Sequence, residues 1–351
     1  MKAIVVVGDG MADRPIEELN GKTPLEAAKK PTLDWIAENG ICGIMDPIAP
    51  GIPPGSDAAT LALLGYDALK VYCGRGALEA IGSGIDIIPD DVAFRCNFAT
   101  VDKNLTVVDR RAGRIEAEDA SRLAERFKKI NLEEDLGVEI TFANTVQHRA
   151  ILRLRGPRLS MMVTDSDPQK VGKPVLRVSP IDGTFEAERT ADIVNKLTQH
   201  FHQVLKKDPI NAERARKGLP PANFVLCRGA GKLPDVIPLS LQYGIRAAAV
   251  GAMPLVKGVC KVAGMRILDV SGATGTYDTD VVAKARAAVQ AVKSHDFVFA
   301  HVKATDVASH DGNAEKKVMM IEKIDKMVSN IVKSVELDET CLLYTSDAAD
   351  E

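Results

Sequence analysis

Aromatic side chains are scarce in this chain: Phe, Trp and Tyr make up 4% of its 351 residues, and Trp35 is its single tryptophan. A core with few rings must be built from Val, Ile, Leu and Ala, which suits buried parallel strands. A strong charge of either sign is also lacking, because the net charge is −3. This balance gives no electrostatic support for binding nucleic acid or an acidic membrane surface. We therefore expect a soluble globular protein with no nucleic-acid partner and no membrane partner.

The six cysteines contain no Cys-x-x-C pair, and the chain is too long for a small disulfide scaffold. No apolar stretch reaches the length of a membrane span, and the apolar run in MKAIVVVGDG is too short for a signal peptide. We interpret the cysteines as reduced thiols and expect a cytoplasmic protein. They are Cys42, Cys73, Cys96, Cys227, Cys260 and Cys341.

Short apolar runs separated by helical segments occur at both ends of the chain. Residues 2–7, KAIVVV, predict a buried strand that ends at a GDG turn. A helix over 24–39, interrupted at Pro31, leads to a predicted strand, ICGIM, at 41–45. After residue 222, the runs NFVLCRGAG, IRAAAVG, MRILDVSG and DFVFAHV resume this pattern. Together they predict an α/β fold with a mostly parallel sheet sandwiched by helices.

The middle of the chain has a different texture. VAFRCNFATV, LTVVDR and AILRLRG alternate apolar with polar residues, as strands with one exposed face do. Amphipathic helices are predicted at about 116–130 and 186–207, and the polar stretch KKDPINAERARKGLPP after the second is typical of a domain boundary. We therefore expect an inserted α+β cap domain. The predicted division is 1–72 and 222–340 for the α/β domain, 73–221 for the cap, and 341–351 for a separate ending.

Ser56 lies in the stretch PPGSDAATL, directly before a helical run. Its simplest role is that of an N-cap, since serine is preferred where a helix has free N–H groups. A serine at this place also experiences the positive end of the helix dipole, which favours an alkoxide or a phosphate ester on its oxygen. The stretch by itself leaves both roles open, with the N-cap favoured.

Two further segments carry polar groups at the ends of predicted strands. Asp9 stands between two glycines, where the backbone can bend close to an ion, although an ordinary strand-to-helix turn fits equally well. Asp306 and His310, in HVKATDVASHDGN, are four residues apart and share a face if the segment is helical. Carboxylate and imidazole at this spacing suit Mn²⁺ or Zn²⁺, and a solvated polar loop is the alternative. All three segments are expected at one edge of one sheet, which is what a metal-activated serine needs.

Eight motifs, taken together and in order, are similar to those of a known enzyme family. The chain resembles the archaeal-type 2,3-bisphosphoglycerate-independent phosphoglycerate mutases, which are alkaline-phosphatase-like metalloenzymes, from residue 1 to about 338. The motifs in order are GDGMADRP, PGSDAATLALLGYD, CGRGALEAIG, AFRCNFATVD, DRRAGRI, SDPQKVGKPV, GATGTYDT and HVKATDVASHDGN.

This resemblance implies an isomerase that interconverts 3-phosphoglycerate and 2-phosphoglycerate in glycolysis and gluconeogenesis. It implies two divalent metal ions, with manganese expected and magnesium, zinc or cobalt as alternatives, and no bisphosphoglycerate cofactor. Asp9 would be a metal ligand, and Ser56 would be both the phosphorylated nucleophile and a metal ligand. Asp306 and His310 would bind the other ion.

The cap of such an enzyme supplies cations that hold the carboxylate and phosphate of the substrate. Asp109 is the candidate base, matched from a family stretch. For each arginine, a solvated position on a charged strand is the alternative. The substrate-binding candidates are Arg110, Arg111, His148, Arg149, Arg228 and Lys257.

The chain departs from the family pattern near its end. That pattern needs a further Asp-His pair and a later histidine, and no histidine follows His310. Residues 341–351, CLLYTSDAADE, read like the in-frame translation of a transposon-type sequencing adaptor. We interpret the chain as C-terminally truncated and expect residues 341–351 to pack poorly. With about two ligands for each ion, we expect weak metal binding and little mutase activity.

Alternatives to the mutase share the residues Asp9, Ser56, Asp306 and His310. They are a metal-dependent phosphatase, another phosphotransferase such as a homoserine-kinase-like protein, and an inactive fragment. The cap arginines distinguish the enzymes, because the serine and the metal ligands are common to all of them. The expected partner is a small phosphoglycerate, and a homo-oligomer is possible.

Overall fold

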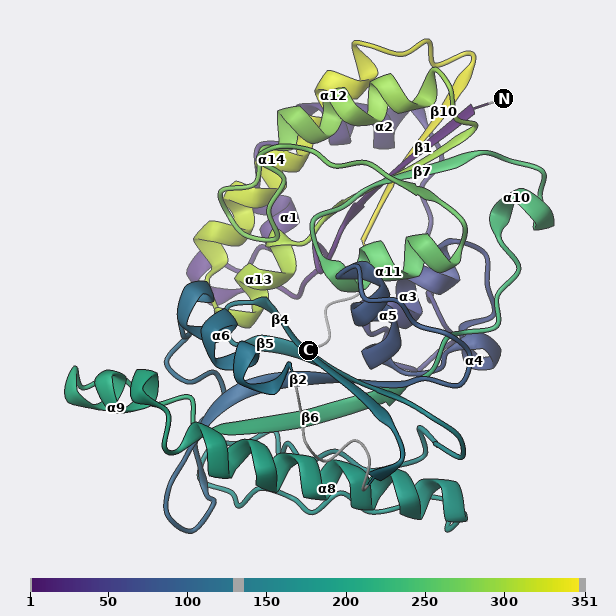
Figure 1. Cartoon of the computed structure of the whole chain (residues 1–351). Coiled ribbons are helices and arrows are strands. Elements are labelled where there is room, and N and C mark those ends of the chain that lie inside the picture. Colours follow the sequence, from purple (N-terminus) through teal and green to yellow (C-terminus); the bar gives the residue numbers. More distant parts are fainter. Residues whose placement is uncertain (1, 129–135, 347–351) are drawn as a thin grey trace. The chain divides into compact units, whose positions relative to one another are not determined.

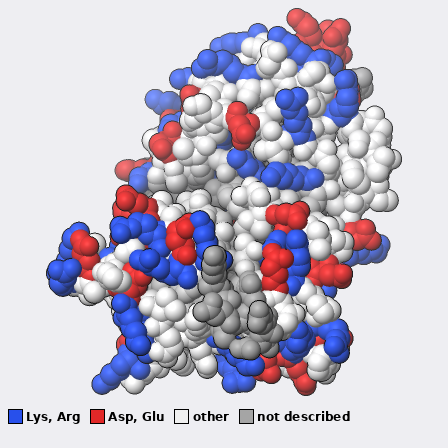
Figure 2. All heavy atoms as spheres, viewed as in Figure 1, with Lys and Arg blue, Asp and Glu red and all other residues white. Residues whose placement is uncertain are grey.

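The structure is a computed structural model that describes residues 2–128 and 136–346. The chain divides into two compact units. Unit 1 comprises residues 1–72 and 235–351, and unit 2 comprises residues 73–234. No helix within the described ranges is both long and apolar enough to cross a membrane. On the face shown in Figure 2, basic and acidic side chains are interspersed over each unit.

Unit 1 is built on a parallel sheet, as the sequence predicts. Its strand order is β10-β1-β9-β7-β8, and every neighbouring pair is parallel. Strand β1 lies between β9 and β10, with Ile4 opposite both Val298 and Leu342. The strands are β1 (Lys2–Gly8), β7 (Ala247–Val250), β8 (Arg266–Ile267), β9 (Phe297–Val302) and β10 (Thr340–Thr345).

Helices cover both faces of this sheet. Figure 1 shows α12 and α14 on one side, with α3 and α11 on the other. The fully buried side chains of Ile4, Val6, Val298 and Ala300 belong to one apolar core with residues of α12 and α14. The helical elements are η1 (Glu17–Leu19), α1 (Pro24–Ala27), α2 (Pro31–Asn39), α3 (Ser56–Leu63), α4 (Ala68–Val71), α10 (Leu239–Gln242), α11 (Pro254–Val262), α12 (Val281–Val292), α13 (Ala304–His310) and α14 (Ala314–Val332).

Two local predictions in the first part of unit 1 have different outcomes. The helix over 24–39 is interrupted before Pro31, as predicted, because the residue before a proline is disfavoured in helical conformation. The predicted strand ICGIM is wrong. Residues 41–46 form no strand, and Ile41 and Ile44 are fully exposed. The edge of the sheet beside β1 is instead occupied by β10.

The expectation that residues 341–351 pack poorly is wrong for the segment that forms β10. Six residues, from Thr340 to Thr345, pair in register with Lys2–Val7 of β1. Leu342 and Tyr344 pack against the core, and the Tyr344 hydroxyl donates a hydrogen bond to the Leu33 carbonyl at 3.3 Å. An edge strand needs only backbone pairing and one apolar face, which CLLYT provides. Residues 347–351 lie outside the described part of the chain.

Unit 2 is built on an antiparallel sheet in which β2 pairs with β3, β5 and β6, and β4 pairs with β5. The compact unit extends to Pro234, beyond the boundary expected at 221, because β6 pairs with β2. The strands are β2 (Val92–Val101), β3 (Val107–Asp109), β4 (Glu139–Val146), β5 (Arg149–Arg155) and β6 (Phe224–Gly231). The helical elements are α5 (Arg75–Gly82), α6 (Ala117–Ala124), η2 (Glu125–Phe127), α8 (Phe185–Leu205) and α9 (Pro209–Arg216).

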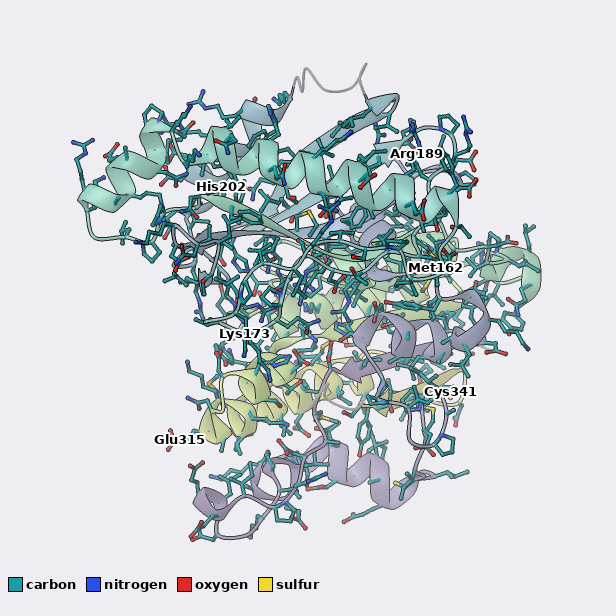
Figure 3. The ribbon with its side chains drawn as sticks, turned by 90° about the horizontal axis from the view of Figure 1, so that it is seen from below. Met162, Lys173, Arg189, His202, Glu315 and Cys341 are labelled. Atoms are coloured by element: carbon teal, nitrogen blue, oxygen red, sulfur yellow. The ribbon has the colours of Figure 1, made fainter. Side chains whose placement is uncertain are left out.

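Helix α8 agrees closely with the helix predicted at 186–207. Figure 3 shows its length, with Arg189 and His202 labelled along it. Its Phe201 packs at 4.5 Å from Phe127 and at 5.0 Å from Phe142, measured between ring centroids. The rings are rare in this chain, yet they are concentrated in the core of unit 2.

Replacement of Phe142 by alanine is expected to destabilise unit 2 by about 3–5 kcal/mol, because a large buried ring leaves a cavity. The urea midpoint of unfolding, followed by circular dichroism, measures this loss. Phe185→Ala is the matched control, since Phe185 is 56% exposed. Equal losses in the two variants would contradict the role of the ring cluster.

Candidate active site

Asp9 is held at the carboxyl end of β1 by its two glycine neighbours. Its side chain is 1% exposed. Gly10 has φ 62°, in the left-handed region that favours glycine. A Cβ at Gly8 would lie 3.0 Å from Cδ1 of Ile324 and 3.2 Å from Cβ of Met11, so a side chain there would require these neighbours to shift. The GDG turn therefore brings a carboxylate into the interior at the edge where ligands of parallel sheets gather.

Ser56 is the first residue of α3. The N-cap position belongs to Gly55, and no side chain caps the helix. The N-cap role favoured for Ser56 from its local sequence is therefore wrong, because its hydroxyl does not bond to the backbone of α3. Its Oγ accepts a hydrogen bond from Nζ of Lys303 at 3.1 Å, and the residue is 7% exposed.

Lys303 follows the end of β9 and brings three groups together. Its Nζ lies 2.9 Å from Oδ2 of Asp9 and 2.8 Å from Oδ2 of Asp306. Since the Ser56 Oγ is also 3.1 Å from this nitrogen, any two of the three oxygens lie within about twice that distance. Strands β1 and β9 are parallel neighbours with Gly8 opposite Val302, so the residues that follow them meet. We call Asp9, Ser56, Lys303 and Asp306 the serine cluster.

The charges of the serine cluster stabilise one another. Burial by itself would raise the pKa of the Asp9 carboxyl, but His301 and Lys303 outweigh it, and the pKa is lowered. Burial opposes the charge of Lys303 as well, yet the two carboxylates of Asp9 and Asp306 raise its pKa. The serine hydroxyl therefore stands beside a charged ammonium and two buried carboxylates.

His301 is a neighbour of this cluster that the sequence analysis missed. It is 1% exposed near the end of β9, and its Nε2 lies 3.1 Å from Oδ2 of Asp9. Lys284 of α12, which is fully buried, donates a hydrogen bond to the His301 carbonyl at 3.0 Å. The signal was a histidine within the apolar run FVFAHV, five residues before Asp306.

The described residues fit one divalent cation better than two. Asp9, Ser56 and Asp306 already surround one positive centre, and Oδ1 of Asp9 is buried without a hydrogen-bond partner in the described chain. His310 lies on α13, as its spacing predicts, with Nε2 3.7 Å from Oδ2 of Asp306. No group of three or more His, Cys, Asp or Glu residues suited to a metal occurs within residues 2–128 and 136–346. The serine oxygen is thus needed to complete a set of three ligands.

Unit 2 contains a separate group of arginines, which we call the arginine cluster. Burial and the nearby Arg149, Arg228 and Arg75 lower the pKa of Arg95 to about 9, against the opposing effect of Glu79. Burial also lowers the pKa of Arg228. Positive charges held together in this way favour an anion. The cluster consists of Arg75, Arg95, Arg110, Arg149 and Arg228, with Glu79 and Asp167 as acidic neighbours.

Three of these arginines were predicted from the sequence, and each has a defined setting. Arg110 donates hydrogen bonds from Nε and Nη2 to the buried carboxylate of Asp167, at 3.1 and 2.7 Å. Arg149 begins β5, and Arg228 lies opposite Arg95 in the pairing of β6 with β2. Arg95 was missed, although it lies in the quoted stretch AFRCNFATVD.

The remaining candidates are placed differently. Asp109 ends β3, where its two oxygens accept hydrogen bonds from the backbone N–H groups of Arg111 and Gly113, at 2.7 and 2.9 Å. Arg111 is exposed on this turn. Lys257 lies on α11 of unit 1, and its Nζ is 3.7 Å from Oδ1 of Asp269.

His148 is buried next to the arginines, and its Nδ1 has no hydrogen-bond partner among the residues described. Burial, with the positive charges of Arg149, Arg111 and Arg95, lowers its pKa from 6.5 to about 3. The imidazole is therefore neutral at physiological pH and can accept a hydrogen bond from a ligand.

This low pKa of His148 predicts a pH dependence of stability. Between pH 6.5 and about 3 the unfolded chain binds a proton at this residue and the folded chain does not. Stability therefore falls as the pH is lowered through this window. His148→Asn is expected to flatten that part of the curve, measured as urea midpoints from pH 7 downward. If the difference in urea midpoint between wild type and His148→Asn stays constant from pH 6.5 to about 3, the prediction is contradicted.

The fold and the serine cluster define a class of protein. It is an α/β protein with a helix-borne serine among buried carboxylates at the carboxyl edge of a parallel sheet, an arrangement suited to phosphoryl transfer through serine. The sequence pattern of the 2,3-bisphosphoglycerate-independent phosphoglycerate mutases matches residues 37–211. The chain belongs to this family, which confirms the resemblance drawn from its motifs.

Individual relatives agree with this placement. A 2,3-bisphosphoglycerate-independent phosphoglycerate mutase from Methanopyrus kandleri is 50% identical over 99% of this chain and 82% of its own length. A counterpart from Methanocaldococcus jannaschii is 46% identical over 99% of this chain and 83% of its own length. Among solved structures, a protein from Pyrococcus horikoshii has a TM-score of 0.83 at 35% identity, covering 99% of this chain and 82% of its own. A cofactor-independent phosphoglycerate mutase from Thermoplasma acidophilum has a TM-score of 0.66 at 37% identity, covering 99% and 87%.

Proposed function

We propose that this chain interconverts 3-phosphoglycerate and 2-phosphoglycerate through a phosphoserine at Ser56, without bisphosphoglycerate. One observation carries the proposal: a buried serine hydroxyl and two buried carboxylates surround a single positive centre at the carboxyl edge of the sheet. The names of the relatives supply the substrate. The reaction is an isomerisation, because the phosphoryl group leaves one oxygen of glycerate and returns to another.

Two divalent ions, with manganese expected and magnesium, zinc or cobalt as alternatives, are part of the proposal. Among the described residues, Asp9, Ser56 and Asp306 would supply three ligands for one ion. The second ion would have only His310, with a share of Asp306, among the described residues. A bound divalent ion would lower the pKa of the serine hydroxyl and offset negative charge that develops during transfer. With few protein ligands for each ion, we expect weak affinity, so that activity saturates only at high metal concentration.

The residues of the chain carry the transfer in two halves. Ser56 Oγ forms a bond to phosphorus as the bond between phosphorus and O3 of glycerate breaks, and the serine proton passes to the departing oxygen. In the second half O2 of glycerate forms a bond to phosphorus as the bond between phosphorus and Ser56 Oγ breaks, and the proton of O2 passes to the departing serine oxygen. Water must be excluded while the phosphoserine exists, because its hydrolysis would release phosphate.

The arginine cluster is proposed to hold the substrate's carboxylate and phosphate. Arginine suits this role because its planar group binds both oxygens of such an anion. His148 would accept a hydrogen bond from a glycerate hydroxyl, since it is neutral. Asp109 stays the candidate base that moves the glycerate proton: its two backbone hydrogen bonds leave other lone pairs of the carboxylate available.

The experiment is an assay of 3-phosphoglycerate with purified chain, Mn²⁺ and no bisphosphoglycerate. We expect 2-phosphoglycerate to form slowly, because each ion has few protein ligands, and we expect the rate to rise with Mn²⁺ concentration and EDTA to stop the reaction. Inorganic phosphate as the main product would assign a phosphatase instead. Transfer from ATP to homoserine, tested in parallel, would assign the homoserine-kinase-like alternative.

A cytoplasmic location is also proposed. All six cysteines are free thiols, which fits a reducing compartment. Fractionation of the source cells with an antibody against the chain tests this location.

A further inference from the structure

Lys303 occupies the place in the serine cluster where a metal ion would be expected. Its ammonium group lies within 3.1 Å of the Ser56 Oγ and of one oxygen from each of Asp9 and Asp306. An ammonium group has three N–H donors, and these three acceptors match their number. The lysine side chain is 16% exposed, so water competes little for it.

The backbone fixes the position of the Lys303 Cα but not the position of its ammonium group. Lys303 follows Val302, the last residue of β9, and holds the N-cap position of α13. Its Cα is therefore fixed by the sheet and the helix. The four-carbon side chain remains flexible, which allows the ammonium group to leave the carboxylates.

Charge explains why a cation is needed here. Asp9 and Asp306 are 1% and 2% exposed, and two buried carboxylates close together repel each other strongly unless a positive group lies between them. A divalent ion would bind the same oxygens at shorter distances than a hydrogen bond allows. The ammonium group and the ion cannot both hold these oxygens at once.

We propose that Lys303 is a built-in cation of the serine cluster, which holds Ser56, Asp9 and Asp306 in place without metal and competes with a divalent ion for the two carboxylates. It is thus a positioning residue for the nucleophile and a determinant of metal affinity. The inference rests on the metal site of the proposed function. It explains how the ligands can be brought together before an ion binds.

The test is a titration of the full chain with Mn²⁺, in which electron paramagnetic resonance measures the free ion. Lys303→Met and Lys303→Gln remove the charge, and Lys303→Arg retains it. If the ammonium group occupies the carboxylates about nine-tenths of the time, its removal strengthens Mn²⁺ binding about tenfold. We expect that gain for Met and Gln, and a dissociation constant close to wild type for Arg.

Lys317→Met is the matched control. Lys317 is another buried lysine of unit 1, and its Nζ contacts Asp13 and Ser309 rather than the serine cluster. Its replacement lowers the positive charge of the chain by the same amount. A similar gain in Mn²⁺ affinity for Lys317→Met would overturn the proposal. Mn²⁺ affinity that is unchanged, weaker or undetectable in both Lys303→Met and Lys303→Gln would also overturn it.

Thermal unfolding gives a second readout. In EDTA the two neutral Lys303 variants are expected to melt several degrees below wild type, and Mn²⁺ is expected to raise their melting temperatures more than that of wild type. A variant that folds only with Mn²⁺ present supports the proposal. Neutral Lys303 variants whose melting temperatures in EDTA equal that of wild type would overturn the proposal.

Failure of the proposed function is distinguishable from failure of this inference. The titration needs no turnover, so a wild type that forms no 2-phosphoglycerate while Lys303→Met binds Mn²⁺ more tightly rejects the mutase and retains the built-in cation. An active wild type with no change in Mn²⁺ affinity in either neutral variant rejects only the built-in cation.

Discussion

Replacement of Ser56 by alanine is expected to abolish both turnover and transfer of phosphate from substrate to protein. The hydroxyl is the only group of the serine cluster that can form a phosphate ester, so no slower version of the same path remains. The loss should be to background rather than partial. Folding should change little, because the hydroxyl does not cap α3 and, within the described part of the chain, its hydrogen bond is with Nζ of Lys303.

The measurement uses 3-phosphoglycerate labelled with ³²P and acid quenching, followed by detection of labelled protein. Label on a peptide that contains Ser56 is expected for wild type at high Mn²⁺ concentration. Ser329→Ala is the matched control, since Ser329 lies within α14 and outside the serine cluster. Labelling of Ser56→Ala at the wild-type level would remove the phosphoserine from the mechanism.

The positions of Asp9, Ser56 and Asp306 could be predicted because of a property of parallel sheets. Each follows or faces the end of a strand, and parallel strands end at the same edge. The alternation of apolar runs and helices therefore indicated both the fold of unit 1 and the place of these side chains. The GDG turn was informative for the same reason, since its glycines permit a conformation that other residues disfavour.

Lys303 and His301 could not be predicted in the same way. Both lie within two residues of the strand end, but the sequence does not determine where a long lysine side chain points. Its direction is set by tertiary neighbours, here the carboxylates of Asp9 and Asp306. His301 was read as part of an apolar strand, and only its burial against Asp9 distinguishes it.

Arg95 shows the corresponding difficulty in unit 2. Alternation in VAFRCNFATV predicted that one face of β2 is exposed, yet every residue of this strand is buried. Strand β2 has partners on both sides, β5 and β6, and helix α5 packs near it, so polar residues are enclosed as well. The C-terminal boundary of unit 2, at Pro234 rather than the expected residue 221, was also missed because of tertiary pairing. Strand β6 pairs with β2, which is distant in the sequence.

Replacement of Asp9 by asparagine is expected to weaken Mn²⁺ binding by at least about a hundredfold, beyond the range that supporting residues around a metal usually cost. Asparagine keeps the shape of the side chain but removes the charge and one strong oxygen ligand. Among the described residues, the variant also leaves Asp306 as the one carboxylate paired with Lys303. We therefore expect a loss of stability of about 1–3 kcal/mol, since a buried charge loses one of its two opposite partners.

Asp13→Asn is the matched control for Asp9→Asn. Asp13 lies four residues further along the same loop and pairs with a different buried lysine, Lys317. This variant should lose stability as well, while its Mn²⁺ affinity stays near wild type. The decisive comparison is the ratio of the two dissociation constants, measured by electron paramagnetic resonance of free Mn²⁺ and checked by calorimetry. A ratio near one would mean that Asp9 pairs with Lys303 and His301 only as a structural ion pair, and that the metal, if bound, lies elsewhere.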